Sequence, residues 1–215
     1  MRLIIYSLTI LTSLGLLAKQ PKWKQVKNEN GITVSNRVRN DGLQEFKAIT
    51  YVKSVKLSSL MAVMDDVPNY KNWMESIVSS HLVKKINSQE RIVYVHFGTP
   101  WPVSDRDNVS YSKVSQNKKD KSITIRMRSR PFEYPKKKGI VRVKKGGGYF
   151  WFKPLKNKVT MIIYQRFTDP GGSVPKWLLR MAGSKVPYQT LRKLRIMVKK
   201  LKYKNKKYSQ INEPW

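Results

Sequence analysis

The chain has 215 residues, 40% hydrophobic and 11% aromatic, so it can bury one full core, and nothing in it divides it into two domains. It has no cysteine, which excludes disulfides, a thiolate nucleophile and a cysteine metal site. The formal net charge of +31 favours polyanionic partners, either anionic membranes or nucleic acid, although a highly soluble basic surface without a partner has the same composition.

Residues 1–18 begin with the cationic pair Met1-Arg2 and continue as an apolar run to Ala18. This pattern is typical of a secretory signal peptide, and the run is a little short for a membrane-spanning helix. We therefore expect an exported protein, periplasmic or extracellular. Leu16 stands where a small residue is preferred before a cleavage site, so an uncleaved N-terminal anchor is one alternative, and a buried core helix is another.

Three strands are predicted in succession, with an Asn30-Gly31 turn between the first two. Apolar residues then recur at helical spacing from Leu57 to Met64, and a short helical piece at 69–75 follows. The predicted strand ranges are 23–27, 31–38 and 45–52.

Seven further strand patterns follow one another with only short turns between them, one of which is predicted at Gly146-Gly147-Gly148. Because no connection is long enough for a parallel crossover, they predict an antiparallel meander. Their ranges are 77–86, 91–97, 106–114, 122–128, 139–145, 149–154 and 158–167.

A long helix is predicted at the C-terminal end of the chain. Pro175 suits its first turn, a break is predicted near Gly183-Ser184 and Pro187, and the helix resumes to about Tyr203, which gives one long bent helix. Apolar residues occupy one face of its second half and basic residues the other, which is typical of a basic amphipathic helix. Residues 204–215 are expected to form a basic and polar tail.

The segment PWPVSDRD at 100–107 is extended because of its two prolines, and we expect its Asp-Arg-Asp to be held by an internal charge-assisted pair. Together with DPGG at 169–172 and the helix start PKWL at 175–178, this segment resembles the START family, the StAR-related lipid-transfer domains. The resemblance covers about residues 23–201, and the predicted START-like domain is 19–203.

The resemblance implies an α+β helix-grip fold, in which a curved antiparallel sheet wraps around the long C-terminal helix and encloses a hydrophobic tunnel. A single helix can cover the concave face of such a sheet without filling it. The implied function is binding of a lipid or other apolar small molecule and its transfer between membranes, by a monomer without a cofactor. A polyketide cyclase-like enzyme on the same fold and a nonspecific polyanion or nucleic-acid binder are the alternatives.

The expected ligand contacts lie on both walls of this tunnel. Strand alternation indicates an apolar side, but it leaves open whether side chains or a ligand fill the space beyond. The expected contacts from the sheet are Tyr94, Ile125, Met127, Met161 and Ile163, and those from the helix are Trp177, Leu178, Met181, Leu191 and Leu194.

Sterol-binding members of the family often hold an acid and a base in the tunnel. The matching positions here are Asn72 and Ser112, so the charged pair is not carried over and sterol is not indicated; both remain candidate polar contacts. Basic residues on the outer face of the last helix are expected to dock an anionic membrane: Arg192, Arg195 and Lys199.

The search for catalytic and metal sites finds no candidates. His81 and His96 lie on separate strand patterns with neither cysteine nor an acidic cluster beside them, so no metal site is predicted. No nucleophile elbow, phosphate loop or dinucleotide fingerprint is present. We therefore expect neither an enzyme nor a specific nucleic-acid binder.

Overall fold

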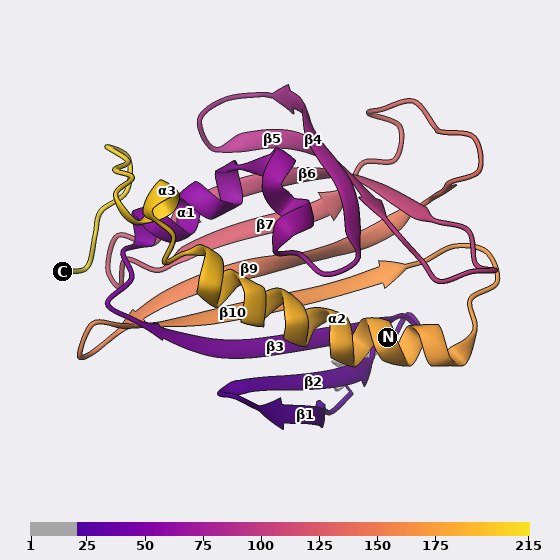
Figure 1. The fold of residues 1–215 in the computed structure, drawn as a ribbon, viewed down its shortest axis with the longest axis horizontal. Helices are drawn as coiled ribbons and strands as arrows, with labels where there is room; N and C mark the ends of the chain where they lie inside the picture. Colours follow the sequence, from indigo (N-terminus) through magenta and orange to yellow (C-terminus); the bar gives the residue numbers. More distant parts are fainter. Residues whose placement is uncertain (1–20) are drawn as a thin grey trace, which may run out of the picture.

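The structure is a computed structural model that describes residues 21–215, so the segment interpreted as a signal peptide or anchor lies outside the described residues. Within 21–215, ten strands form one curved sheet (Figure 1). The strands are β1 (Lys24–Glu29), β2 (Ile32–Val38), β3 (Gln44–Lys53), β4 (Ile77–Lys85), β5 (Glu90–Phe97), β6 (Arg106–Gln116), β7 (Ile123–Ser129), β8 (Val141–Arg142), β9 (Lys145–Leu155) and β10 (Val159–Asp169). The helices are α1 (Leu57–Asp65), the 3-10 helix η1 (Val67–Asn72), α2 (Lys176–Met197) and α3 (Leu201–Lys204). Across this described part, no helix is both long and apolar enough to cross a membrane.

The strands follow the order β1-β2-β3-β10-β9-β7-β6-β5-β4, and every pair along this path is antiparallel. Strand β10 lies between β3 and β9, so it joins the N-terminal strands to the rest of the sheet. The strand predicted at 139–145 forms only in part. Its middle is the two-residue strand β8, which pairs in parallel with β6, and its last residue, Lys145, begins β9. The α+β helix-grip architecture is otherwise as expected.

The three glycines at 146–148 do not form the predicted turn, because all three lie within β9. Gly148 has φ +155°, and a Cβ atom there would overlap the carbonyl oxygen of Gln165. Only glycine fits this position. Gly148 pairs with Met127 on one side and Arg166 on the other. Because glycine has no side chain, the sheet backbone between these two residues is uncovered.

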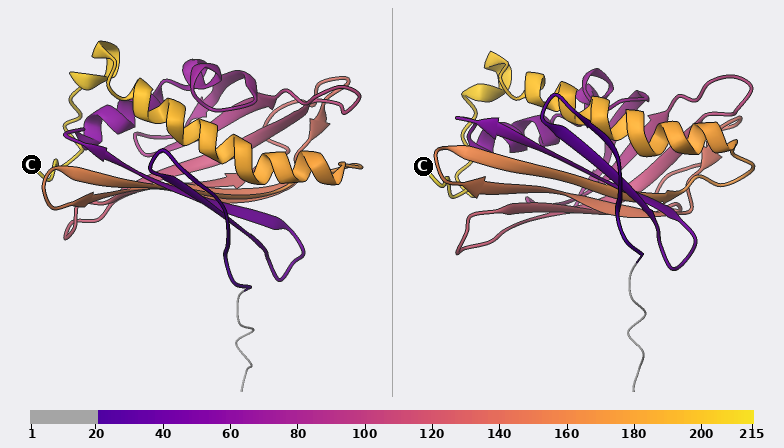
Figure 2. Two further views of the ribbon diagram at one scale, coloured as in Figure 1. Left: turned by 60° about the horizontal axis from the view of Figure 1, so that its bottom comes forward. Right: turned by 90° about the horizontal axis from the view of Figure 1, so that it is seen from below.

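Helix α2 lies across the concave face of the sheet, with α1 and η1 beside it (Figure 2). The predicted break near Gly183 and Pro187 does not occur, since α2 runs through both residues to Met197. Proline removes one intrahelical hydrogen bond, but Pro187 and Tyr188 are both buried, and packing on the sheet maintains the helix.

The segment predicted as a basic and polar tail packs onto the domain. The Glu213 carboxylate accepts hydrogen bonds from the backbone amides of Leu57 and Ser58, at 2.8 and 2.9 Å, and so caps the N-terminus of α1. The Gln116 amide donates to the Asn212 carbonyl at 2.8 Å. This segment therefore contributes to the fold around α1.

Candidate ligand cavity

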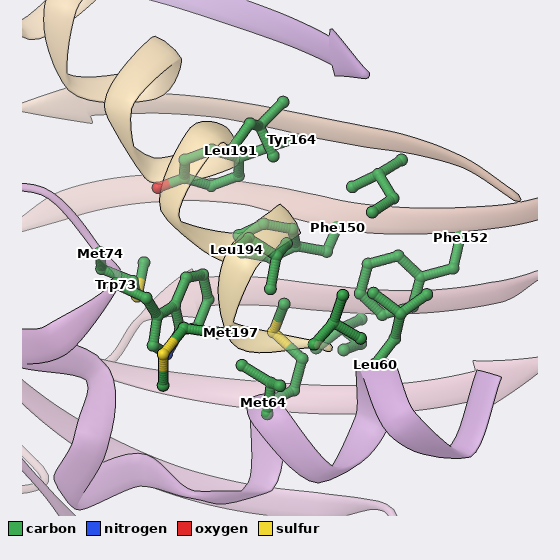
Figure 3. Packing of buried hydrophobic residues seen from close by; sticks show 14 of the residues in the cluster. Leu60, Met64, Trp73, Met74, Phe150, Phe152, Tyr164, Leu191, Leu194 and Met197 are labelled. Carbon is green, nitrogen blue, oxygen red and sulfur yellow. The ribbon is translucent and has the colours of Figure 1, made fainter. Parts of the chain in front are cut away.

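The C-terminal half of α2 packs against the sheet in solid contact. Leu191 and Leu194 have no exposed surface, and they pack near the aromatic rings of Tyr164 and Phe150 (Figure 3). The Trp73 ring lies beside Phe150, with 6.1 Å between the ring centroids. Leu191 and Leu194, two of the expected ligand contacts, therefore lie in the packed core and line neither of the two cavities described below.

Replacing Leu194 with alanine should lower the free energy of unfolding by about 2–5 kcal/mol, since it opens a void in a packed core. Urea denaturation followed by circular dichroism would measure the change. Lys199→Ala, at an exposed position just after α2, is the control and should shift stability by less than about 0.5 kcal/mol. A loss below 1 kcal/mol for Leu194→Ala, on the order expected of a surface residue, would contradict solid packing.

The N-terminal half of α2 instead covers a cavity of about 200 Å³. Of the three expected ligand contacts in this half of the helix, Leu178 and Met181 line the cavity, whereas Trp177 is 44% exposed and lies outside it. Most of the wall is apolar; the remaining apolar contributions come from Phe46, Phe97, Val143, Tyr164, Pro170, Val174, Leu179, Ala182 and Val186. The structure thus provides a mainly apolar, partly open cavity beneath the N-terminal half of α2.

A second, smaller cavity of about 40 Å³ lies deeper, beneath Trp73. Ile125, Met127 and Ser112 line it, so these three predicted contacts do face the interior. Arg166 lines both cavities and marks the boundary between them.

Tyr94 was expected in the tunnel but lies on the opposite face of the sheet. Its ring stacks on His81 at 4.8 Å between centroids, while Val93 and Val95 face the interior. Burial, together with the nearby Asp107 carboxylate, raises the pKa of Tyr94 to about 12. Strand β5 is buried on both faces at this point, so the hydrophobicity of its residues does not show which face lines the cavity.

Met161 and Ile163 also face away from the cavities. Ile162 and Tyr164, their neighbours on β10, belong to the interior core, and strand alternation turns the other two outward. Four consecutive apolar residues conceal the alternation that would have indicated the correct face.

Asn72 lies at the end of η1, is exposed, and donates a hydrogen bond to Asn69. The adjacent Trp73 turns inward instead and has no exposed surface. Asn72 is therefore not a cavity residue, and the polar contacts of the interior come from the sheet.

The predicted internal ion pair of the Asp-Arg-Asp segment, residues 105–107 at the cavity mouth, does not form. Arg106 lines the large cavity and donates to the carbonyls of Ser104 and Gly171, the second at 3.4 Å. Asp107 instead forms a buried ion pair with Arg142, at 2.5 Å. Arg106 thus joins the 98–105 loop to the loop that precedes α2.

Asp105 holds the base of the 98–105 loop. Its carboxylate accepts hydrogen bonds from the Thr99 amide and from His96 Nε2, both at 2.8 Å. Burial raises the pKa of Asp105, but the Thr99 amide and His96 outweigh it, so the net pKa lies below its ordinary value. This contact therefore stabilises the loop at neutral pH and is lost as the pH falls through that lowered pKa.

The three residues expected to dock a membrane differ in their surroundings. Arg192 and Lys199 are exposed, but Arg195 donates to the Asn30 carbonyl at 2.6 Å and so fastens α2 to the β1–β2 turn.

The loops at 98–105, 130–140 and 170–175 gather at the opposite end of the molecule from α3 (Figure 1). Two of them carry strongly exposed aromatic residues, Trp101 at 91% and Phe132 at 93%.

The sequence analysis did not single out Arg166, which lies within the strand predicted at 158–167. Strand alternation places residues 160, 162, 164 and 166 on one face of the strand, but it does not show which face is the inner one. Once Tyr164 is placed inside, Arg166 must also point inward.

Comparison with known proteins agrees with this architecture. Mouse phosphatidylcholine transfer protein is 26% identical over 166 residues, which cover 74% of this chain and 76% of that protein. A crystal structure of a STAR-related lipid transfer protein from Xanthomonas axonopodis is 29% identical, with a TM-score of 0.74, covering 83% of this chain and 99% of that one. Human StAR-related lipid transfer protein 5 has the same fold, with a TM-score of 0.68 at 21% identity over 82% of this chain and 86% of that one. The START domain model matches residues 9–207, and the chain belongs to the START domain family.

Proposed function

We propose that this protein binds one lipid in the cavity beneath α2 and carries it between membranes, without catalysing a reaction. The observation that carries the proposal is the apolar space roofed by Leu178, Leu179 and Met181. The names of the relatives above, which are lipid transfer proteins, support the same class of ligand.

Desolvation supplies the driving force. Burying apolar surface returns about 25 cal/mol per Å², so about 400 Å² of lipid surface corresponds to about 10 kcal/mol before the costs of association. Few polar contacts are needed for binding of this kind. The mainly apolar lining of the large cavity suits such a ligand.

Uptake requires the N-terminal half of α2 to move outward. The cavity of about 200 Å³ is smaller than the roughly 300–1,000 Å³ of typical ligand pockets. Gly171 and Gly172 precede α2 with φ of +63° and +62°, and position 172 has open space around it. We assign the hinge to these two glycines, because glycine adopts such backbone conformations without steric cost.

The loop end of the molecule is our proposed membrane contact. Exposed tryptophan and phenylalanine side chains partition into the membrane interface, and Trp101 and Phe132 both stand in loops at this end. Lys136, Lys137 and Lys138 in the same loop as Phe132 are exposed and would add attraction to anionic lipid. Arg192 and Lys199 would add to it from the outer side of the helix. An exported location, periplasmic or extracellular, completes the proposal.

Filling the cavity should block lipid uptake while the fold persists. In Met181→Trp the larger side chain occupies the space under α2, so we expect at least a tenfold loss of bound lipid. Native mass spectrometry after incubation with phospholipid vesicles would measure it. Lys185→Trp, an exposed position one helical turn further along, is the matched control and should bind normally. Equal loading of both variants would show that lipid binds elsewhere, and an unloaded wild-type protein would contradict the function itself.

A further inference from the structure

One row of inward-facing side chains crosses the floor of both cavities, from β5 to β2. Its members are paired directly across neighbouring strands: Arg91, Ser112, Met127, Gly148, Arg166, Phe46 and Asn36. Three of its seven members are apolar, and two of the other four are half-buried arginines, whose charge is costly to remove from water without a partner.

The two arginines differ in how their charge is balanced. Arg91 pairs with Asp65 at 2.5 Å and also donates to the Met64 carbonyl. Arg166 has no carboxylate within 4.0 Å among residues 21–215; its Nε donates to the Thr168 hydroxyl at 3.3 Å, and its guanidinium lies over the Phe97 ring at 5.3 Å. A guanidinium carries five N–H donors, so most of those of Arg166 are free to bind a ligand.

The surroundings of Arg166 leave room for a small polar group. The bare position of Gly148 lies next to it, and no other residue fits there. Ser110 and Ser112 add hydroxyl groups on the far side of the smaller cavity. No Asp or Glu lines the smaller cavity among the described residues, and Glu45, which lines the larger one, is already paired with Arg37 and Arg39. Within residues 21–215, no free carboxylate there would balance the cation of a zwitterionic head group.

We propose that Arg166 is the head-group site of the cavity and that it takes an amphiphile with an oxyanion head, a phosphodiester or a carboxylate. A guanidinium binds two oxygens of such a head side by side. The head would lie at the boundary of the two cavities, and the apolar tail would lie in the larger one under Leu178 and Met181. The inference rests on the proposed lipid binding and adds a preference: anionic lipids over phosphatidylcholine.

Competitive loading from mixed vesicles tests this preference. Wild type, Arg166→Met and Arg166→Lys are each incubated with vesicles of phosphatidylglycerol, phosphatidylcholine and oleic acid in equal amounts, repurified, extracted and quantified by mass spectrometry. Because every lipid is in the same vesicle, attraction of the basic protein to the membrane affects all three equally. Arg126→Met is the matched control, since Arg126 is an exposed arginine on β7, which is separated from β10 by β9.

We expect wild type and Arg126→Met to be enriched in phosphatidylglycerol or oleate, and the lipid that is enriched identifies the head as phosphodiester or carboxylate. Arg166→Met should lower the anionic-to-phosphatidylcholine ratio about tenfold, which corresponds to about 1.4 kcal/mol, while Arg166→Lys retains part of it. An unchanged ratio in Arg166→Met, with normal total loading, would overturn the head-group site and leave lipid binding standing. Wild-type protein that carries no lipid would overturn both. Should Arg166→Met not fold, Arg166→Lys and Arg166→Gln give the same comparison, with thermal melts as the check on folding.

Discussion

A disulfide between positions 36 and 183 should abolish lipid uptake. Gly183 lies in α2 and Asn36 in β2, and both line the large cavity. A Cβ atom at position 183 would lie 3.3 Å from Asn36 Cγ, so the two side chains are close enough for a disulfide, whose Cβ atoms are about 3.5–4.5 Å apart. The bond would hold α2 on the sheet and prevent the outward movement that uptake requires.

The test uses the Asn36→Cys, Gly183→Cys double variant, with transfer of a fluorescent lipid between vesicles as the measurement. The chain has no cysteine of its own, so only the intended bond can form within one molecule. Oxidised protein should be inactive, and reduction should restore transfer. Each single cysteine variant controls for the substitution itself. Transfer at the wild-type rate by fully oxidised protein would contradict opening of α2 and would place the entrance elsewhere.

Replacing Asp107 with asparagine should cost about 3–5 kcal/mol of stability, since it leaves a buried arginine without its counter-charge. Both side chains of the Asp107–Arg142 pair are almost fully buried, at 1% and 4% exposure. Arg142 also donates to the backbone carbonyls of Pro131, Tyr134 and Pro135, so the pair fixes the 130–140 loop at the cavity end. Urea denaturation would measure the loss.

Two further variants test whether the loss of stability in Asp107→Asn comes from the unpaired charge of Arg142 or from any substitution in this loop. Glu133→Gln removes an exposed carboxylate from the same loop and should change stability by less than about 0.5 kcal/mol. The double variant Asp107→Asn, Arg142→Met removes both charges and should be more stable than Asp107→Asn alone, because no unpaired cation remains buried. A double variant as unstable as the single one would show that the ion pair is not the cause.

The relation of individual residues to the cavity could be predicted only in part. Leu178, Met181, Ile125, Met127 and Ser112 face the interior cavities as expected. The other expected tunnel residues are in the core, on the far side of the sheet or at the surface. Where both faces of a strand are apolar, as in β5 and β10, a sequence contains no information on which face is enclosed.

The sequence by itself determined the order of strands and helices, the antiparallel pairing and the family, because alternation, helical spacing and turn residues are local properties. Only the tertiary structure decided which part of the interior is filled by packed side chains and which part contains a cavity. Trp73 and Phe150 fill the space under Leu194, while Gly148 leaves the floor bare beside Arg166. These residues come from distant parts of the chain, and the volume between them depends on how the strands register and on the path of α2, which no local pattern specifies.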